Sequence, residues 1–191
     1  MNVLHPTLWR TCRVLANPVR LRVLQQVSAG GETHVSAAAR ACHLPLSSAT
    51  AALRALQARG LLGVRREGSF VIYVARADDS VEHATAVLAA VRQAFRSSNL
   101  PEEIMRGATA FTHVRRILIV QALAVKPVDA STLSVVCGIS RPALYRHLDK
   151  LARRGVVSAD RNDVWQLVAP KSRFLRELVT LVTAGRFSAP T

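Results

Sequence analysis

The chain has 191 residues, half of them hydrophobic, which is enough for one large domain or two small ones with a real core and excludes a disordered tail. Lys and Arg number 26 against 12 acidic residues, and the resulting net charge of +14 favours partners that carry phosphate groups. Only three of the basic residues are lysines, so an Arg-rich genome could produce the same excess. The positions of the arginines must decide between these two interpretations.

The sequence predicts a soluble protein of the reducing cytoplasm. Its three cysteines have no CxxC spacing, which argues against a disulfide framework or a structural zinc site. Residues 1–20 contain no apolar signal core. The longest apolar run, 117–125, is interrupted by Gln121 and is far shorter than the roughly 20 residues that a membrane span needs. We therefore expect neither export nor membrane insertion.

In chain order, hydrophobic spacing first predicts a series of helices. They cover residues 6–16, 19–27, 36–42 and about 47–60. The period then changes to that of strands at 62–66 and 70–74, which flank the sequence GluGlySer and predict a hairpin. Helical spacing returns over 78–95.

The same order of elements recurs, at an offset of 155 − 60 = 95 residues and without a gap. Identical residues related by this offset begin at Val19, Arg20, Gln26, Ser36, Cys42, Leu53, Leu56, Arg59, Gly60 and Arg66. Because register is kept from the second helix through the hairpin, the sequence predicts two copies of one domain. We place them at residues 1–97 and 98–191, joined near SerSerAsnLeuPro at 97–101.

Residues 138–157 carry a complete helix signal with a basic outer face. Ser140 is a good N-cap, Pro142 falls in the first turn, and Gly155 stands where the helix should stop. An apolar stripe of Leu144, Leu148 and Leu151 lies opposite a side that bears Arg141, Tyr145, Arg146 and Arg153. A merely solvated face is the simpler alternative, but this pattern suits a helix that lies on nucleic acid.

ANPVRLRVLQQV at 16–27 and GISRPALYRHLDKLARRGVV at 138–157 resemble the winged helix-turn-helix domain of ArsR-type bacterial transcription regulators. The resemblance implies a mainly α fold with small β-hairpin wings, and double-stranded DNA as the partner. In such a domain the helix after the turn enters the major groove and the wing touches the backbone or the minor groove. It also implies a regulator, most simply a repressor, rather than an enzyme.

The resemblance assigns the DNA contacts unevenly to the two copies. In the second copy the candidates on the recognition helix are Ser140, Arg141, Tyr145, Arg146 and His147. In the first copy they are Ser47, Ser48, Thr50 and Arg54, which can hold phosphates but discriminate bases poorly. The candidates on the wings are Arg65, Arg66 and Arg161. Since Asp160 and Asp163 accompany the second wing, we expect the first wing to be the better contact.

Family members bind DNA as symmetric homodimers through their first and last helices. Here 78–95 and 102–110, helped by the first helix and by 174–182, could make those contacts within one chain. The two winged helix-turn-helix domains in tandem would then form an intramolecular pseudo-dimer on a pseudo-palindromic site. Further homodimerisation remains open.

The sequence gives little support for a metal site, a reactive thiol or an enzyme. The family's arsenic-type thiols would fall at His34 and Ser36, and Asp79 with His83 on the predicted helix 78–95 has no second pair, so we expect no metal and no cofactor. Cys42 and Cys137 are interpreted as core residues. No catalytic motif is present in the sequence. The alternative function is a protein-interaction or assembly module that kept the winged-helix scaffold and lost DNA reading.

Overall fold

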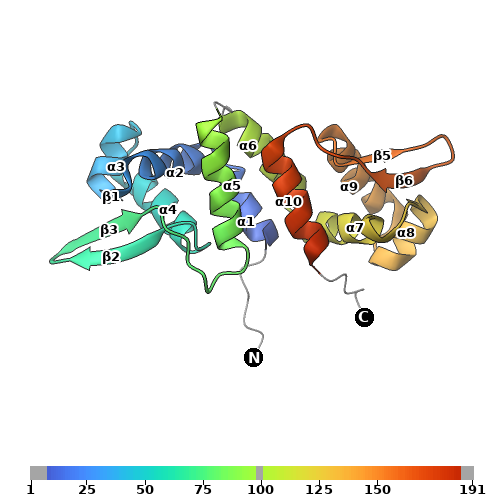
Figure 1. Cartoon of the computed structure of the whole chain (residues 1–191), viewed down its shortest axis with the longest axis horizontal. Helices are drawn as coiled ribbons and strands as arrows, with labels where there is room; N and C mark the ends of the chain where they lie inside the picture. The colour runs from blue at the N-terminus through green and yellow to red at the C-terminus, as the bar shows by residue number, and fades with distance from the viewer. Residues whose placement is uncertain (1–7, 98–100, 186–191) are drawn as a thin grey trace. The chain divides into compact units, whose positions relative to one another are not determined.

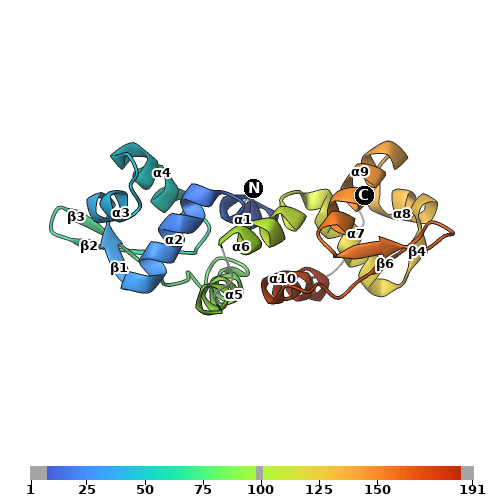
Figure 2. The ribbon, with the colours of Figure 1, turned by 90° about the horizontal axis from the view of Figure 1, so that it is seen from above.

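A computed structural model describes residues 8–97 and 101–185 of the chain. The contacts between residues divide it into two compact units, Met1–Met105 and Arg106–Thr191. Figure 1 and Figure 2 show the helices and strands of both units from two sides. Each unit is mainly helical with a small antiparallel sheet, which confirms the predicted secondary-structure class and is consistent with winged helix-turn-helix folds.

The first unit contains the predicted helices and hairpin, with one strand more. Its elements are α1 (Leu8–Leu15), α2 (Pro18–Gly30), β1 (Glu32–His34), α3 (Val35–Ala41), α4 (Leu46–Gln57), β2 (Gly63–Glu67), β3 (Phe70–Val74) and α5 (Ala84–Arg96). The restart after α1 has a local cause, since the Asn17 side chain accepts a hydrogen bond from the Arg20 N–H at 3.0 Å and caps α2. Helix α2 ends at Gly31, whose φ of 79° favours glycine.

The second unit has the corresponding order of elements, with one short 3-10 helix in addition after its first helix. Its elements are α6 (Pro101–Ala108), which starts before the division between the units, η1 (Thr109–Phe111), α7 (Val114–Val125), β4 (Val128–Asp129), α8 (Ala130–Cys137), α9 (Arg141–Arg153), β5 (Val157–Ala159), β6 (Val164–Leu167) and α10 (Arg173–Ala184). Asp129 caps α8 by accepting the Thr132 N–H at 2.9 Å. Gly138, at a φ of 61°, ends α8 and forms the turn into α9.

Each sheet has three strands, because a short strand before the third helix of the unit pairs with the hairpin. The order is β1-β3-β2 in the first unit and β4-β6-β5 in the second, antiparallel throughout. Glu32 lies opposite Val74, and Val128 lies opposite Trp165. The sequence analysis missed β1 and β4, since strands this short have no alternating pattern to detect.

The last helix of the first unit starts later than predicted. Helix α5 begins at Ala84 rather than at Asp78, and His83 before it has a left-handed φ of 66°. Asp78 instead accepts hydrogen bonds from the backbone N–H and the hydroxyl of Ser80, at 3.0 and 2.6 Å. An Asp that bonds two residues ahead stabilises a turn in place of a helix.

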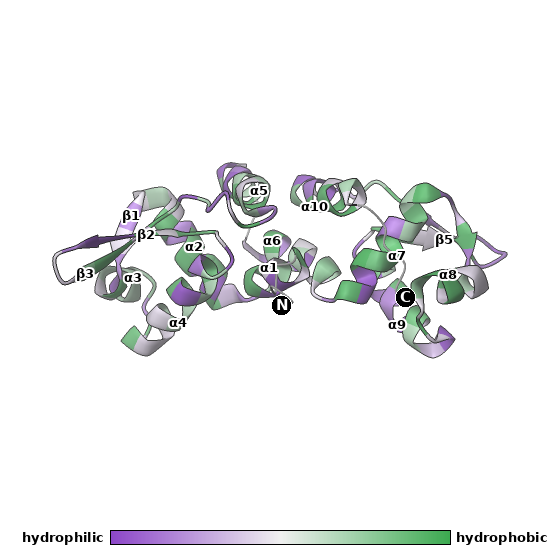
Figure 3. Ribbon diagram, turned by 90° about the horizontal axis from the view of Figure 1, so that it is seen from below, coloured by the Kyte–Doolittle hydropathy of each residue, from purple (hydrophilic) through white to green (hydrophobic). Residues whose placement is uncertain are grey.

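The cores come from the apolar stripes of the helices. Helix α4 buries Ala49, Leu53 and Leu56, and helix α9 likewise buries Leu144 and Leu148, which are 0 % exposed. Figure 3 shows that both helices carry hydrophobic and hydrophilic residues, as an amphipathic helix must.

Among the helices of the described residues, no single one is long and apolar enough to cross a membrane. One pair, Pro101–Phe111 with Val114–Val125, meets the length and composition test only together and is bent by 80° at the break.

Candidate nucleic-acid interface

The first half of helix α9 has a basic exposed side and a buried apolar side. It begins at Arg141 and ends at Arg153, and Gly155 follows with a φ of 71°, as the sequence predicts. Ser140 occupies the N-cap position, but its side chain makes no capping hydrogen bond, so its hydroxyl is not used to start the helix. Arg141 and Arg146 are exposed, while Leu144 is completely buried between them. These two guanidinium groups therefore face solvent at the first half of the helix.

Tyr145 joins α9 to the turn between β5 and β6. Its hydroxyl donates a hydrogen bond to Oδ2 of Asp163, and Oδ1 of the same carboxylate accepts the Trp165 Nε1–H at 2.8 Å. Asp163 raises the pKa of Tyr145, while the Arg141 guanidinium beside it acts in the opposite direction. The phenol is 39 % exposed, so its ring remains available although its hydroxyl proton is already engaged. The carboxylate that was expected only to repel phosphate thus positions a candidate contact.

His147 differs from the exposed candidates of α9, because its ring lies beside His113 at the start of α7. Its ring is half-buried and packs against His113, with the ring centroids 4.8 Å apart. Burial first, and then the positive charges of His113, Arg116 and other neighbours, together lower the pKa of His147 to about 4. The imidazole is therefore neutral at pH 7 and directed toward α7.

At the corresponding positions, α4 has fewer side chains that could contact DNA. The Thr50 hydroxyl donates to the carbonyl of Leu46 at 2.7 Å, one helical turn earlier, so its proton is used within the helix. Ser47 and Arg54 are exposed, and Ser48 is half-buried. Leu46, at the start of the helix, is 57 % exposed. Of the predicted contacts on α4, only Arg54 brings a charge to the surface.

The wing arginines differ in their partners. Arg65 on β2 forms an ion pair with Glu32 of β1, with Nη2 2.9 Å from Oε1, and a second with Glu67, with Nη1 2.7 Å from Oε2. Glu32 first, and then Glu67, raise the pKa of Arg65. Arg66, the next residue, is exposed and makes no ion pair with any residue that the structure describes. Phe70, paired with Glu67 across the hairpin, is 63 % exposed.

Arg161 lies in the turn between β5 and β6 and is exposed. Its turn is held by Asp160, whose Oδ1 accepts the N–H groups of Asn162 and Val164 at 2.8 and 2.9 Å. On the first wing, Arg65 is ion-paired within the unit and the neighbouring Arg66 is not. On the second wing, Arg161 lies between Asp160 and Asp163, which both accept hydrogen bonds from other groups of the chain.

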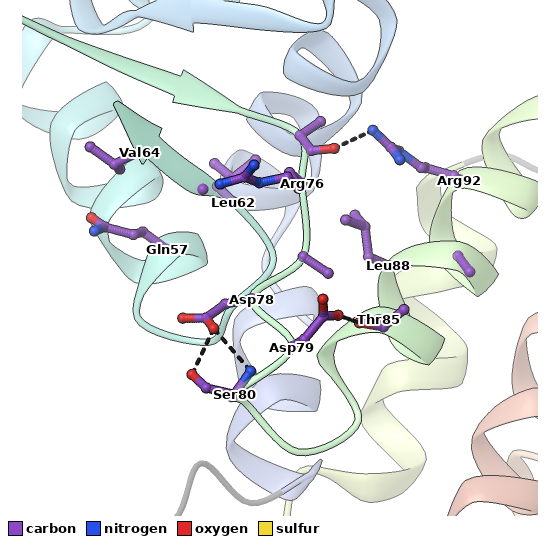
Figure 4. Close-up of a pocket in the computed structure, with 14 residues that line it drawn as sticks. Gln57, Leu62, Val64, Arg76, Asp78, Asp79, Ser80, Thr85, Leu88 and Arg92 are labelled. Atoms are coloured by element: carbon purple, nitrogen blue, oxygen red, sulfur yellow. Dashed lines mark hydrogen bonds between the residues drawn. The ribbon is translucent and has the colours of Figure 1, made fainter. Parts of the chain in front are cut away.

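A cavity of the first unit, of about 880 Å³, lies between the end of the hairpin and α5 (Figure 4). Its polar side chains bond within the chain: Asp79 accepts the Thr85 hydroxyl at 2.6 Å, and Arg92 donates to the carbonyl of Ala75. Because α5 starts at Ala84, Asp79 and His83 do not share a helical face, contrary to the prediction. This cavity therefore offers few groups to a ligand.

Neither thiols nor metal ligands gather in the described residues. Cys42 and Cys137 are both 2 % exposed, which confirms their interpretation as core residues. Burial raises the pKa of Cys137 to about 11, so its reactive thiolate form is suppressed at pH 7. Within residues 8–97 and 101–185, no three His, Cys, Asp or Glu side chains are close enough together to hold a metal ion.

The helix pair α8–α9, its turn at Gly138 and the strand that follows define a helix-turn-helix segment of the DNA-binding class. Residues 113–159 match the family described as bacterial regulatory protein, arsR family. The match runs from the N-cap of α7 to the end of β5. This segment is thus an ArsR-family helix-turn-helix domain, which supports a DNA-binding transcription regulator. A comparison with curated proteins gives no match.

Proposed function

We propose that the chain is a sequence-specific regulator of transcription, acting as a repressor, in which the first half of α9 reads the major groove of double-stranded DNA. The observation that carries this proposal is the exposure of Arg141 and Arg146 on a helix whose other face is buried, inside the segment that matches the ArsR family. Arginine donates two hydrogen bonds to O6 and N7 of guanine, the commonest specific contact in the major groove.

Within this proposal Arg146 is the main base-reading residue. Arg141 is drawn toward the Tyr145 phenol, which is itself held by Asp163, so these two side chains are already oriented before DNA binds. Arg146 has no such restraint in the described part of the chain and can turn toward a base edge. Ser140, with its hydroxyl not used for capping, is placed to contact a phosphate.

We further propose that the chain consists of two winged helix-turn-helix domains, 1–97 and 98–191, that arose by duplication. The shared element order supports this, and so do the bounds of the helices: α4 at 46–57 shifted by 95 gives 141–152, against 141–153 for α9. Likewise, α3 at 35–41 gives 130–136, against 130–137 for α8. The correspondence ends at the last helix, because α5 shifted by 95 begins at 179 and α10 begins at 173.

In this arrangement one chain supplies two unlike DNA-binding helices, as a pseudo-dimer on a pseudo-palindromic site. Helix α4, with Arg54 and Ser47 exposed, would hold phosphates, and Arg66 of the first wing and Arg161 of the second would contact the backbone. Helix α9 would supply the discrimination between bases.

One observation favours the second candidate, a protein-interaction or assembly module. Leu46 on α4 and Phe70 on the first wing are 57 % and 63 % exposed at positions where a DNA-binding domain would present polar groups. An apolar partner surface would cover both side chains better than DNA would.

Fluorescence anisotropy with DNA from upstream of the chain's own gene, and with random duplex, separates the two functions. The regulator should bind with a salt dependence of about 0.9 log unit per log unit of salt for each phosphate neutralised. Arg146→Ala should reduce binding to the specific site more than to random DNA, whereas the exposed control Lys171→Ala should lower both equally. Binding that is undetectable or insensitive to salt would favour the interaction module.

A further inference from the structure

The Tyr145 side chain lies on the same exposed side of α9 as the two arginines that are proposed to meet DNA. Arg141 stands one helical turn before it and Arg146 directly after it, and all three residues are exposed. Leu144 and Leu148, on the other side of the helix, are completely buried. A duplex that lies along the exposed side of α9 therefore meets the Tyr145 ring as well as the two guanidinium groups.

The hydrogen-bonding capacity of the Tyr145 phenol is used within the second unit. Its hydroxyl donates to Oδ2 of Asp163, in the turn between β5 and β6. Asp163 raises the pKa of Tyr145 and the Arg141 guanidinium lowers it, so both groups interact with the phenol oxygen. The part of Tyr145 that is left for a contact outside the unit is its aromatic ring.

Asp163 is itself held through both oxygens of its carboxylate. Oδ1 accepts the Nε1–H of Trp165 at 2.8 Å, while Oδ2 accepts the Tyr145 hydroxyl. The backbone of Asp163 has a left-handed φ of 58°, which Asp and Asn adopt more readily than most residues with a side chain. Trp165 lies on β6, where it pairs with Val128 of β4. The carboxylate thus connects the phenol of α9 to the sheet of the same unit.

A phosphate is a poor partner for this phenol. To donate to a phosphate oxygen, the Tyr145 hydroxyl would have to leave Asp163, whose carboxylate would then lose a donor and stand beside a second negative charge. An apolar contact of the ring requires neither change. The apolar group that base pairs present in the major groove is the 5-methyl group of thymine, and aromatic rings are among the side chains that contact it.

We propose that the Tyr145 ring contacts the 5-methyl group of a thymine, and that Asp163 is the positioning residue for this contact. The inference rests on the proposed function and deepens it, because it adds a thymine to the base that Arg146 reads. The hydrogen bond to Asp163 restricts the Tyr145 side chain before DNA arrives, so less side-chain freedom is lost on binding.

Replacement of single thymines by deoxyuridine tests the contact, because the exchange removes only the methyl group and keeps the base pair. The probe for fluorescence anisotropy of the full chain is the tightest duplex selected from a randomised library, at one salt concentration. At one thymine of this duplex, we expect the exchange to weaken wild-type binding about threefold to fivefold, as the loss of one apolar carbon contact implies. Tyr145→Ala should bind the thymine and deoxyuridine duplexes equally.

Asp163→Asn separates positioning from charge. Asparagine keeps the shape of the side chain and tolerates the left-handed φ, but its amide has one acceptor oxygen in place of two. We expect the preference for thymine to fall to about twofold or less, while affinity for random duplex rises because a negative charge leaves the wing. Tyr145→Phe removes the same hydrogen bond from the other partner, so it should reduce the preference similarly and keeps the test valid if Asp163→Asn fails to fold.

Asp160→Asn is the matched control for Asp163→Asn. It removes the same charge from the same turn, and the oxygen that remains can still accept the N–H groups of Asn162 and Val164. Affinity for random duplex should rise as in Asp163→Asn, whereas the preference for thymine should stay at the wild-type value. An equal loss of preference in both variants would show that the charge of the turn, and not the bond to Tyr145, sets the preference.

Two results would overturn the methyl contact itself. One is a wild type that tolerates the exchange at every thymine, and the other is an exchange that weakens Tyr145→Ala as much as the wild type. A full preference for thymine in Asp163→Asn and Tyr145→Phe would overturn the positioning role. Selective binding that depends on Arg146 but on no thymine methyl group would contradict this inference and leave the proposed function standing. If no duplex is preferred over random DNA, the proposed function fails together with the inference.

Discussion

Helices α4 and α9 resemble each other on the buried side and differ on the exposed side. Ala49, Leu53 and Leu56 of α4 stand 95 residues before Leu144, Leu148 and Leu151 of α9, and all six side chains are buried. On the exposed side, Leu46 and Ala51 correspond by the same offset to Arg141 and Arg146. The apolar stripe is what docks such a helix on its unit, so the outer face can change without loss of the fold.

The contrast teaches that packing and recognition are separable on one helix. Thr50 corresponds to Tyr145, and each hydroxyl has a different partner: the carbonyl of Leu46 in α4, and the wing carboxylate of Asp163 in α9. Helix α4 satisfies its polar group within itself, whereas α9 is connected to its wing. Helix α9 is thereby fixed relative to the turn of its wing.

The largest effect on stability should come from the buried apolar stripe, which α4 and α9 have in common. Leu148→Ala removes a fully buried side chain, and we expect the free energy of unfolding to fall by about 2 to 5 kcal/mol. Leu53→Ala, at the equivalent position of α4, should cause a loss in the same range. Leu46→Ala, at an exposed site, should change it by less than about 0.5 kcal/mol. Denaturant unfolding measures all three, and a tolerant Leu148→Ala variant would show that the stripe of α9 is not core.

A smaller effect should come from the pH dependence of stability, because α9 has a titratable His147 where α4 has Ala52. The pKa of His147 is lowered from 6.5 to about 4 in the folded chain. Between these pH values the unfolded chain binds a proton that the folded chain does not, so stability should decrease as the pH falls from 6.5 toward 4. Allowing for partial exposure to solvent, we expect a contribution of about 1 kcal/mol.

NMR titration of the imidazole protons gives the pKa directly, and His147→Gln should remove this part of the pH dependence. An ordinary histidine pKa near 6.5 would show that the ring is solvated.

The smallest effect concerns the wing of the first unit. Arg66→Ala should weaken binding to random DNA and reduce the salt slope by about one phosphate contact. Arg65→Ala should leave that slope unchanged, because Glu32 and Glu67 already bind its guanidinium. Anisotropy titrations at several salt concentrations compare the two variants. A larger effect of Arg65→Ala would mean that DNA displaces the two glutamates.

Much of the fold follows from local pattern. The stripe of Leu144, Leu148 and Leu151, with Pro142 and Gly155 at its two ends, was sufficient to predict α9. The hairpin of the first unit was predicted with its second strand, 70–74, at the observed bounds. These signals are contained within a few residues, which is why periodicity detects them.

The remaining features depend on partners distant in sequence. Arg65 is paired with Glu32, which lies 33 residues away, so its position on the predicted wing left it as a candidate DNA contact. His147 turns toward His113 because the start of α7 packs against α9, and helical periodicity does not contain that information. Strands β1 and β4 form only where a hairpin edge is present to pair with them. Local patterns predicted the elements, whereas the chemical state of each side chain required the tertiary structure.

The central claim is that α9 discriminates bases while α4 only holds the backbone. The most direct measurement is the ratio of affinities for specific and random duplex in Arg146→Ala and Arg54→Ala, both exposed arginines on corresponding helices. The account predicts that Arg146→Ala lowers this ratio, by about 1 to 3 kcal/mol of discrimination, whereas Arg54→Ala weakens both affinities and leaves the ratio unchanged. Equal losses on both duplexes for Arg146→Ala, or a fall in the ratio for Arg54→Ala, would contradict it.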